Sequence, residues 1–91
     1  MAGVEAGEMN ACKYIMLDDI YPILFCRGMT HIEVSNRFVS PDRQVTSAGF
    51  VMITTDPNKE EVKVYTFGKS VSLGIGRKPS DEKWIKKMLT D

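Results

Sequence analysis

Two short apolar runs near the start of the chain predict a β-hairpin. Residues 13–17 read Lys-Tyr-Ile-Met-Leu and residues 23–26 read Ile-Leu-Phe-Cys. Runs of this length between turn residues are typical of buried strands. Asp18 and Asp19 interrupt the first run, and Pro22 opens the second; proline has no N–H to donate and therefore suits a strand start or an edge. We expect the two runs to pair, with the two aspartates in the turn.

The next segment predicts a helix that begins at Thr30. A Thr followed three residues later by Glu, here Glu33, has the spacing of a capping box. Pro41 stops the helix near Val39. At about 100° per residue, one side of this helix carries the apolar residues, with His31 and Ser35 near its middle. The apolar residues on that side are Ile32, Val34, Phe38 and Val39.

Residues 45–75 predict a three-stranded meander. The first strand, 45–55, is rich in β-branched residues, and the sequence Asp-Pro-Asn-Lys at 56–59 favours a type I turn. The return strand spans 61–67. Gly68-Lys69 is typical of a two-residue type II′ hairpin loop, and apolar residues then alternate with polar ones over 70–75.

A short amphipathic helix is expected at the C-terminus. Ser80 suits an N-cap, and acidic residues follow it in the first turn, where the helix dipole favours negative charge. The apolar stripe consists of Trp84, Ile85, Met88 and Leu89. The element order β-β-α-β-β-β-α predicts an α+β domain: an antiparallel sheet of about five strands with two short helices on one face. We assign residues 1–11 to a flexible tail and 12–91 to the single domain.

Composition narrows the function classes. The chain has 91 residues, 43% of them hydrophobic, and equal numbers of basic and acidic residues give it a net charge of zero. Zero net charge disfavours a nucleic-acid-coating protein or a polybasic membrane anchor. No apolar run is long enough to span a membrane and no secretory signal pattern is present, so we expect a cytoplasmic protein with Cys12 and Cys26 reduced.

Sequence motifs for catalysis or cofactor binding are incomplete. Gly68-Lys69-Ser70 lacks the preceding glycine of a phosphate-binding loop, and the glycines at 74 and 76 lack the third glycine of a dinucleotide fingerprint. Cys12, Cys26 and His31 have irregular spacing and no fourth zinc ligand. We therefore expect no enzymatic activity, no metal and no cofactor, and interpret His31 as structural.

The strands are apolar on both faces, which predicts an interface. Two short helices can cover one face of the sheet, and the other face would then expose a large apolar patch of the kind that marks binding surfaces. We expect a homodimer or another protein partner on this face. The candidate interface residues are Tyr14, Met16, Phe50, Met52, Tyr65 and Phe67.

A basic cluster near the C-terminus leaves a second possibility open. Its members are Arg77, Lys78, Lys83, Lys86 and Lys87. These side chains suit weak contact with nucleic acid or with an acidic protein surface.

Four strings carry a family resemblance that covers residues 13–89. They are Tyr-Ile-Met-Leu-Asp at 14–18, Pro-Ile-Leu-Phe at 22–25, Ser-Ala-Gly-Phe at 47–50 and Gly-Lys-Ser-Val-Ser-Leu at 68–73. They are similar to short uncharacterised orphan proteins of bacteria and their phages. The resemblance implies a small accessory protein that binds and inhibits a host or defence component, and it transfers no residue roles.

The leading hypothesis is thus a non-enzymatic protein-binding module that self-associates. The alternatives are a small-ligand or nucleotide binder that uses residues 47–49 and the turn at 68–70, and weak nucleic-acid contact through the basic cluster.

Overall fold

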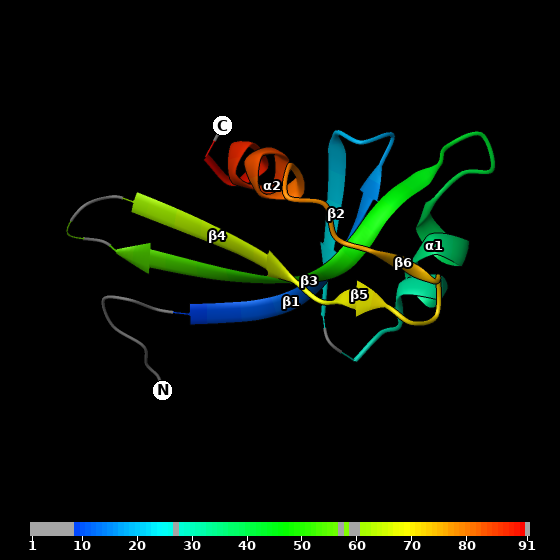
Figure 1. Cartoon of the computed structure of the whole chain (residues 1–91), viewed down its shortest axis with the longest axis horizontal. Coiled ribbons are helices and arrows are strands. Elements are labelled where there is room, and N and C mark those ends of the chain that lie inside the picture. Colours follow the sequence, from blue (N-terminus) through cyan, green and yellow to red (C-terminus); the bar gives the residue numbers. More distant parts are fainter. Residues whose placement is uncertain (1–8, 27, 57, 59–60, 91) are drawn as a thin grey trace.

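The protein is an α+β domain, as predicted. The computed structural model describes residues 9–26, 28–56, 58 and 61–90. The helices are α1 (His31–Phe38) and α2 (Asp81–Thr90), and the strands are β1 (Met9–Leu17), β2 (Tyr21–Phe25), β3 (Val45–Asp56), β4 (Glu61–Phe67), β5 (Lys69–Ser70) and β6 (Ile75–Gly76). β2, β1, β3 and β4 form, in that order, an antiparallel sheet, and β5 pairs with β6 (Figure 1).

The N-terminal hairpin forms as expected, but β1 is longer than the apolar run. Residues 13–17 pair with 21–25, and Asp18 and Asp19 turn the chain with φ values of 52° and 68°. The strand already begins at Met9, so residues 9–11 belong to the sheet and not to a tail; residues 1–8 lie outside the described part of the chain. The extension exists because β3 is 12 residues long and pairs with β1 from Met9 onward.

The meander prediction holds for β3 and β4 and fails after them. The proposed turn at 56–59 falls partly on residues 57 and 59, outside the described residues. Gly68, with φ 73°, does not reverse the chain, because β5 pairs with β6 and not with β4. The reversal comes later: the Gly74 N–H donates to the Ser70 carbonyl at 2.9 Å, and Leu73 N–H donates to the Ser70 hydroxyl. Val71, expected inside a strand, lies in this turn and is 85% exposed.

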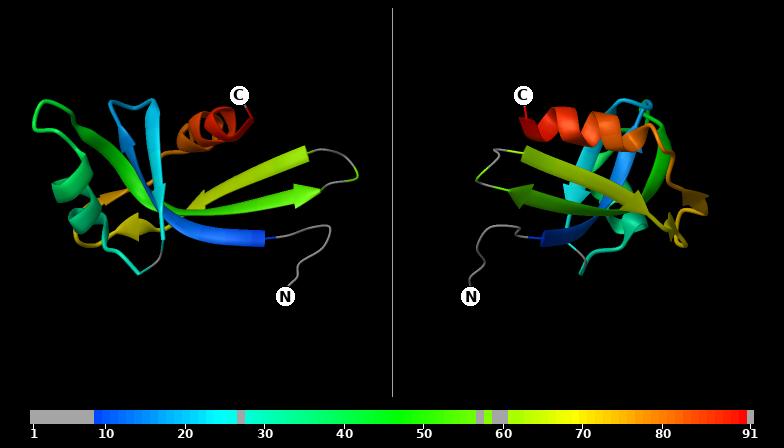
Figure 2. Two further views of the ribbon diagram at one scale, coloured as in Figure 1. Left: turned by 180° about the vertical axis from the view of Figure 1, so that it is seen from behind. Right: turned by 60° about the vertical axis from the view of Figure 1, so that its left-hand side comes forward.

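The two helices cover opposite faces of the sheet, which corrects the expectation that they share one. Val34 of α1 packs with Ile15, Leu17 and Ala48. Ile85 of α2 packs with the other face, against a cluster of Tyr14, Met16, Val51 and Val64. Alternate residues of a strand point to opposite faces, so the two-sided apolar pattern of β1 requires a cover on each side. Figure 2 shows α2 along β4 and α1 towards the other end of the sheet.

Helix α1 begins as predicted but buries only part of the predicted apolar side. The Thr30 hydroxyl accepts from Glu33 N–H at 3.2 Å, and Thr30 N–H donates to the Glu33 carboxylate at 2.8 Å, which completes the capping box. His31 and Val34 are buried, whereas Ile32 and Phe38 are 41% and 63% exposed. Neither helix of the described chain is long and apolar enough to cross a membrane.

Candidate functional site

One end of the sheet projects beyond β2 and α1 as a three-stranded extension. We call it the outer arm: residues 9–12 of β1, residues 50–56 of β3, and β4. β2 does not reach it, because β2 ends at Phe25, opposite Lys13. The arm extends away from α1 (Figure 1), while α2 packs against one of its faces through Val51 and Val64. Within the described part of the chain, no helix lies over its other face.

The uncovered side of the outer arm, which we call the open face, is apolar at its centre. Phe50 pairs with Phe67, and Met52 with Tyr65, so the strand alternation places these four side chains together on that face. The Phe50 and Phe67 rings stack with centroids 5.6 Å apart. Tyr65 and Phe67 are 50% and 43% exposed. Four of the six predicted interface residues therefore form one surface.

The interface prediction is wrong for Tyr14 and Met16. Both are fully buried under α2, in the cluster that contains Ile85. Their position follows from the register: Tyr14 is opposite Gly49, one residue before Phe50, and one residue changes the face. The sequence cannot fix this register between β1 and β3, because the strand is apolar on both sides.

Charges of both signs lie along the open face. The pairs next to the aromatic centre are Thr54–Lys63 and then Asp56–Glu61. At the inner end, the Lys13 ammonium lies 5.9 Å from the Phe50 ring centroid and donates to the Met29 carbonyl at 2.9 Å. The face thus carries lysines beside its aromatic centre and an acidic pair at its tip.

His31 closes the inner border of the open face. It is 4% exposed, its Nε2 lies 2.9 Å from the Gly49 carbonyl oxygen, and its ring stands edge-on to Phe25 and Phe50. Burial lowers the pKa of His31, so the neutral imidazole is favoured and Nε2–H donates to Gly49. This geometry fits the structural role expected for this histidine and packs its ring in a T-shaped contact with Phe50.

A buried carboxylate fastens α2 to the sheet. Asp81 is 1% exposed; its Oδ2 accepts from the Tyr14 hydroxyl at 2.6 Å and from Lys78 N–H at 2.9 Å, and its Oδ1 accepts from the Ser47 hydroxyl at 2.9 Å. Burial, and then the bond to Asp81, raise the pKa of Tyr14 far above its ordinary value. The sequence suggested Asp81 only as a first-turn acid, and nothing in its spacing reveals the three partners.

The segments proposed for a small ligand lie together but are closed. A Cβ at Gly49 would lie 2.9 Å from the Phe67 carbonyl oxygen, so strand backbone occupies this place. Ser47 and Ser70 are both fully buried. Ser47 is bound to Asp81, and Ser70 accepts from Leu73 N–H. Neither hydroxyl is available to a ligand.

The basic cluster does not form one patch. The Arg77 guanidinium donates to the Thr66 hydroxyl at 2.7 Å and lies 3.6 Å from Glu82, and the Lys78 ammonium lies 2.8 Å from Asp19. Lys83, Lys86 and Lys87 lie on the exposed side of α2. Lys83 and Lys86, together with Lys63 of β4, border a shallow hollow of about 270 Å³ that is also lined by Tyr65. The sequence did not indicate that Lys63 belongs to this group.

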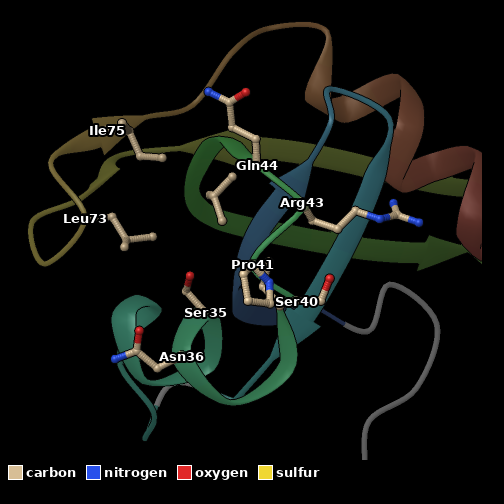
Figure 3. A pocket seen from close by; sticks show the side chains of 10 residues that line it. Ser35, Asn36, Ser40, Pro41, Arg43, Gln44, Leu73 and Ile75 are labelled. Carbon is tan, nitrogen blue, oxygen red and sulfur yellow. The ribbon is translucent and has the colours of Figure 1, made fainter.

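A second hollow, of about 550 Å³, lies between α1, the segment that follows it, and the β5–β6 hairpin (Figure 3). Val39, Val45, Leu73 and Ile75 supply its apolar part, while hydroxyl and amide side chains, among them Asn36, supply its polar part. Arg43 also borders it, but the Arg43 guanidinium is paired with Asp18 at 3.1 Å. The lining of this hollow is therefore mixed, with apolar and polar side chains side by side.

Neither the search for a metal site nor the comparison with known proteins assigns a function to this chain. Among the described residues no group of three or more His, Cys, Asp and Glu side chains is placed to hold a metal ion, and Cys12 and Cys26 are free thiols. Comparison with protein-family models, with curated proteins and with solved structures finds no match to this chain.

Proposed function

We propose that the chain is a non-enzymatic protein-binding module that self-associates through the open face. The observation that carries this proposal is the group of Phe50, Met52, Tyr65 and Phe67, which lie side by side on a sheet surface without a helix over it. Aromatic residues and methionine are enriched in protein interfaces, and large exposed apolar patches mark binding surfaces.

Charge favours a second copy as the occupant. Lys63 flanks the aromatic centre and Asp56 and Glu61 lie at its tip, so the open face presents both signs to an identical face. The chain has a net charge of zero, so two copies do not repel one another at long range. Opposed charges around an aromatic centre are the arrangement of a self-complementary patch.

The polar groups that suit catalysis have structural partners, which supports a binding role. The Asp81 carboxylate is buried and holds Tyr14 and Ser47, and His31 is held by Gly49. No buried side-chain polar atom of the described residues lacks a hydrogen-bond partner. The chemistry within reach of solvent is therefore mainly that of an apolar surface with charged borders.

The experiment is sedimentation equilibrium on the whole chain at micromolar concentration. We expect a mass above the 10.2 kDa of one chain, and a lower mass for Tyr65→Lys, which places a charge at the aromatic centre. Val71→Lys is the matched control, because Val71 is exposed and apolar but lies in the β5–β6 turn. A wild-type mass of 10.2 kDa, or equal masses for wild type and Tyr65→Lys, would contradict the proposal.

A second candidate function, weak contact with nucleic acid, is favoured by the hollow between β4 and α2. Lys63, Lys83 and Lys86 border it together with Tyr65, and lysines gathered in this way can bind phosphate groups. The neutral chain and nearby Glu82 argue that such contact is weak.

A further inference from the structure

Residues 45–49 of β3 have no partner in β4, and β3 is contacted there by β5 and β6. The described sheet has three further stretches of outer strand edge, and two of them carry features that block pairing. Pro22 lies opposite Met16 on β2 and has no N–H to offer at that edge. On β4, Thr66 N–H donates to the Glu82 carboxylate at 2.7 Å, and α2 lies along the strand. Proteins protect edge strands in such ways because an open edge pairs with other strands.

The third stretch, residues 9–12 of β1, carries none of these features. It reads Met-Asn-Ala-Cys, without proline or charge. β3 lies on one side of it, and β2 stops short of it on the other, where it ends opposite Lys13. A bulge in this pairing occurs only at the far end of β1, between Met16 and Leu17.

The register shows which backbone groups point outward at this edge. Thr66 N–H points away from β3, since Glu82 accepts from it. Thr66 is opposite Val51, and Val51 is opposite Cys12. Because backbone groups alternate sides along an antiparallel strand, those of Val51 point to β1 and those of Cys12 to β3. The N–H and C=O of Ala11 then point to the open side.

We propose that this edge pairs with the same edge of a second copy, antiparallel and about a two-fold axis. Met9 of each copy would lie opposite Ala11 of the other, because alternation turns the backbone groups of both residues outward. β2 ends at Phe25, opposite Lys13, and therefore leaves the positions beside residues 9–12 free for a strand of the second copy. The result is a continuous sheet through both copies.

The second copy is favoured over other occupants by symmetry and charge. Two identical strands can pair antiparallel about a two-fold axis, so each contact in the interface occurs twice and one mutation changes both copies of it. The edge residues carry no charge and the chain is neutral, so no repulsion opposes their approach. This interface goes beyond the proposed use of the open face, and the two point in different directions. A chain that uses both assembles beyond a dimer.

The test is sedimentation equilibrium on four whole chains: wild type, Ala11→Pro, Tyr65→Lys and the double variant. Proline at 11 removes an N–H that the β1–β3 ladder does not use, and Ala11→Val is the control that keeps it. We expect a mass above that of a dimer for wild type, a dimer for each single variant, and 10.2 kDa for the double variant. Equal masses for Ala11→Pro and wild type would overturn the edge pairing and leave the open face untouched. Equal masses for Tyr65→Lys and wild type, with a lower mass for Ala11→Pro, would overturn the use of the open face and leave the edge pairing untouched.

Amide hydrogen exchange on the wild-type chain gives a readout without mutation. Protection of the Ala11 amide should rise with protein concentration, because a second copy supplies the acceptor. An unprotected Ala11 amide, or protection that is independent of concentration, would overturn the proposal; the latter result would assign the edge to another segment of the same chain.

Discussion

Removal of the Tyr14 hydroxyl should destabilise the fold without opening a cavity. In Tyr14→Phe the ring still fills its place beneath α2, while Asp81 loses the donor 2.6 Å from Oδ2 and keeps those from Ser47 and Lys78. A hydrogen bond to a charged group contributes about 1.5–3 kcal/mol. Because Asp81 is 1% exposed, water cannot replace the lost donor. We expect the free energy of unfolding to fall by about 2 kcal/mol.

The assay is urea unfolding followed by tryptophan fluorescence, with Tyr21→Phe as control. Tyr21 is 52% exposed, and substitutions at such surface sites change stability by about 0.5 kcal/mol or less. Equal midpoints for Tyr14→Phe and Tyr21→Phe would refute the reasoning, because the Tyr14–Asp81 bond would then contribute nothing measurable.

The same pair of variants has a pH signature. Burial and Asp81 raise the pKa of Tyr14 above its unfolded value, so its contribution to stability is complete below about pH 10 and declines as the pH rises further. Wild type and Tyr21→Phe should both show this alkaline decline, and Tyr14→Phe should lack the part due to Tyr14. An unchanged alkaline decline in Tyr14→Phe would show that the hydroxyl is not held in its neutral form.

Two further predictions concern α1 and the lysines of α2. Thr30→Ala should lower the free energy of unfolding by about 1 kcal/mol, because the N–H of Glu33 loses its acceptor. Thr30→Ser keeps the hydroxyl and should retain stability in the same urea assay. Equal stability of the two variants would show that the capping oxygen has no effect. The wild-type chain should bind single-stranded DNA weakly and in a salt-sensitive way, as measured by fluorescence anisotropy. Replacement of Lys83, Lys86 and Lys87 by Gln should abolish this binding, and Lys69→Gln is the control. Tight wild-type binding that is insensitive to salt would exclude this contact.

The sequence placed some members of the open face correctly and others wrongly. Alternation within β3 and β4 placed Phe50 with Met52, and Tyr65 with Phe67, because each strand has a strict two-residue period. It could not place Tyr14, whose face depends on the register between β1 and β3. Lys63 was missed beside Lys83 and Lys86 because β4 and α2 meet only in the folded chain.

Local chemistry in the sequence determined the element types. The Thr30–Glu33 box starts α1, the aspartates after Leu17 turn the first hairpin, and the β-branched run from Val45 makes β3. Each of these signals acts over a few residues, where backbone preference and side-chain hydrogen bonds decide the conformation.

Tertiary structure alone decided which surfaces are covered. The sheet order, the placement of α1 and α2 on opposite faces, and the extension of β1 to Met9 all depend on pairings between distant segments. An apolar strand is equally compatible with cover on either side, so its sequence cannot say which face stays open. Packing of Ile85 on one face and Val34 on part of the other leaves the aromatic surface of the outer arm open, because two short helices cannot cover both faces of a sheet that is extended at one end.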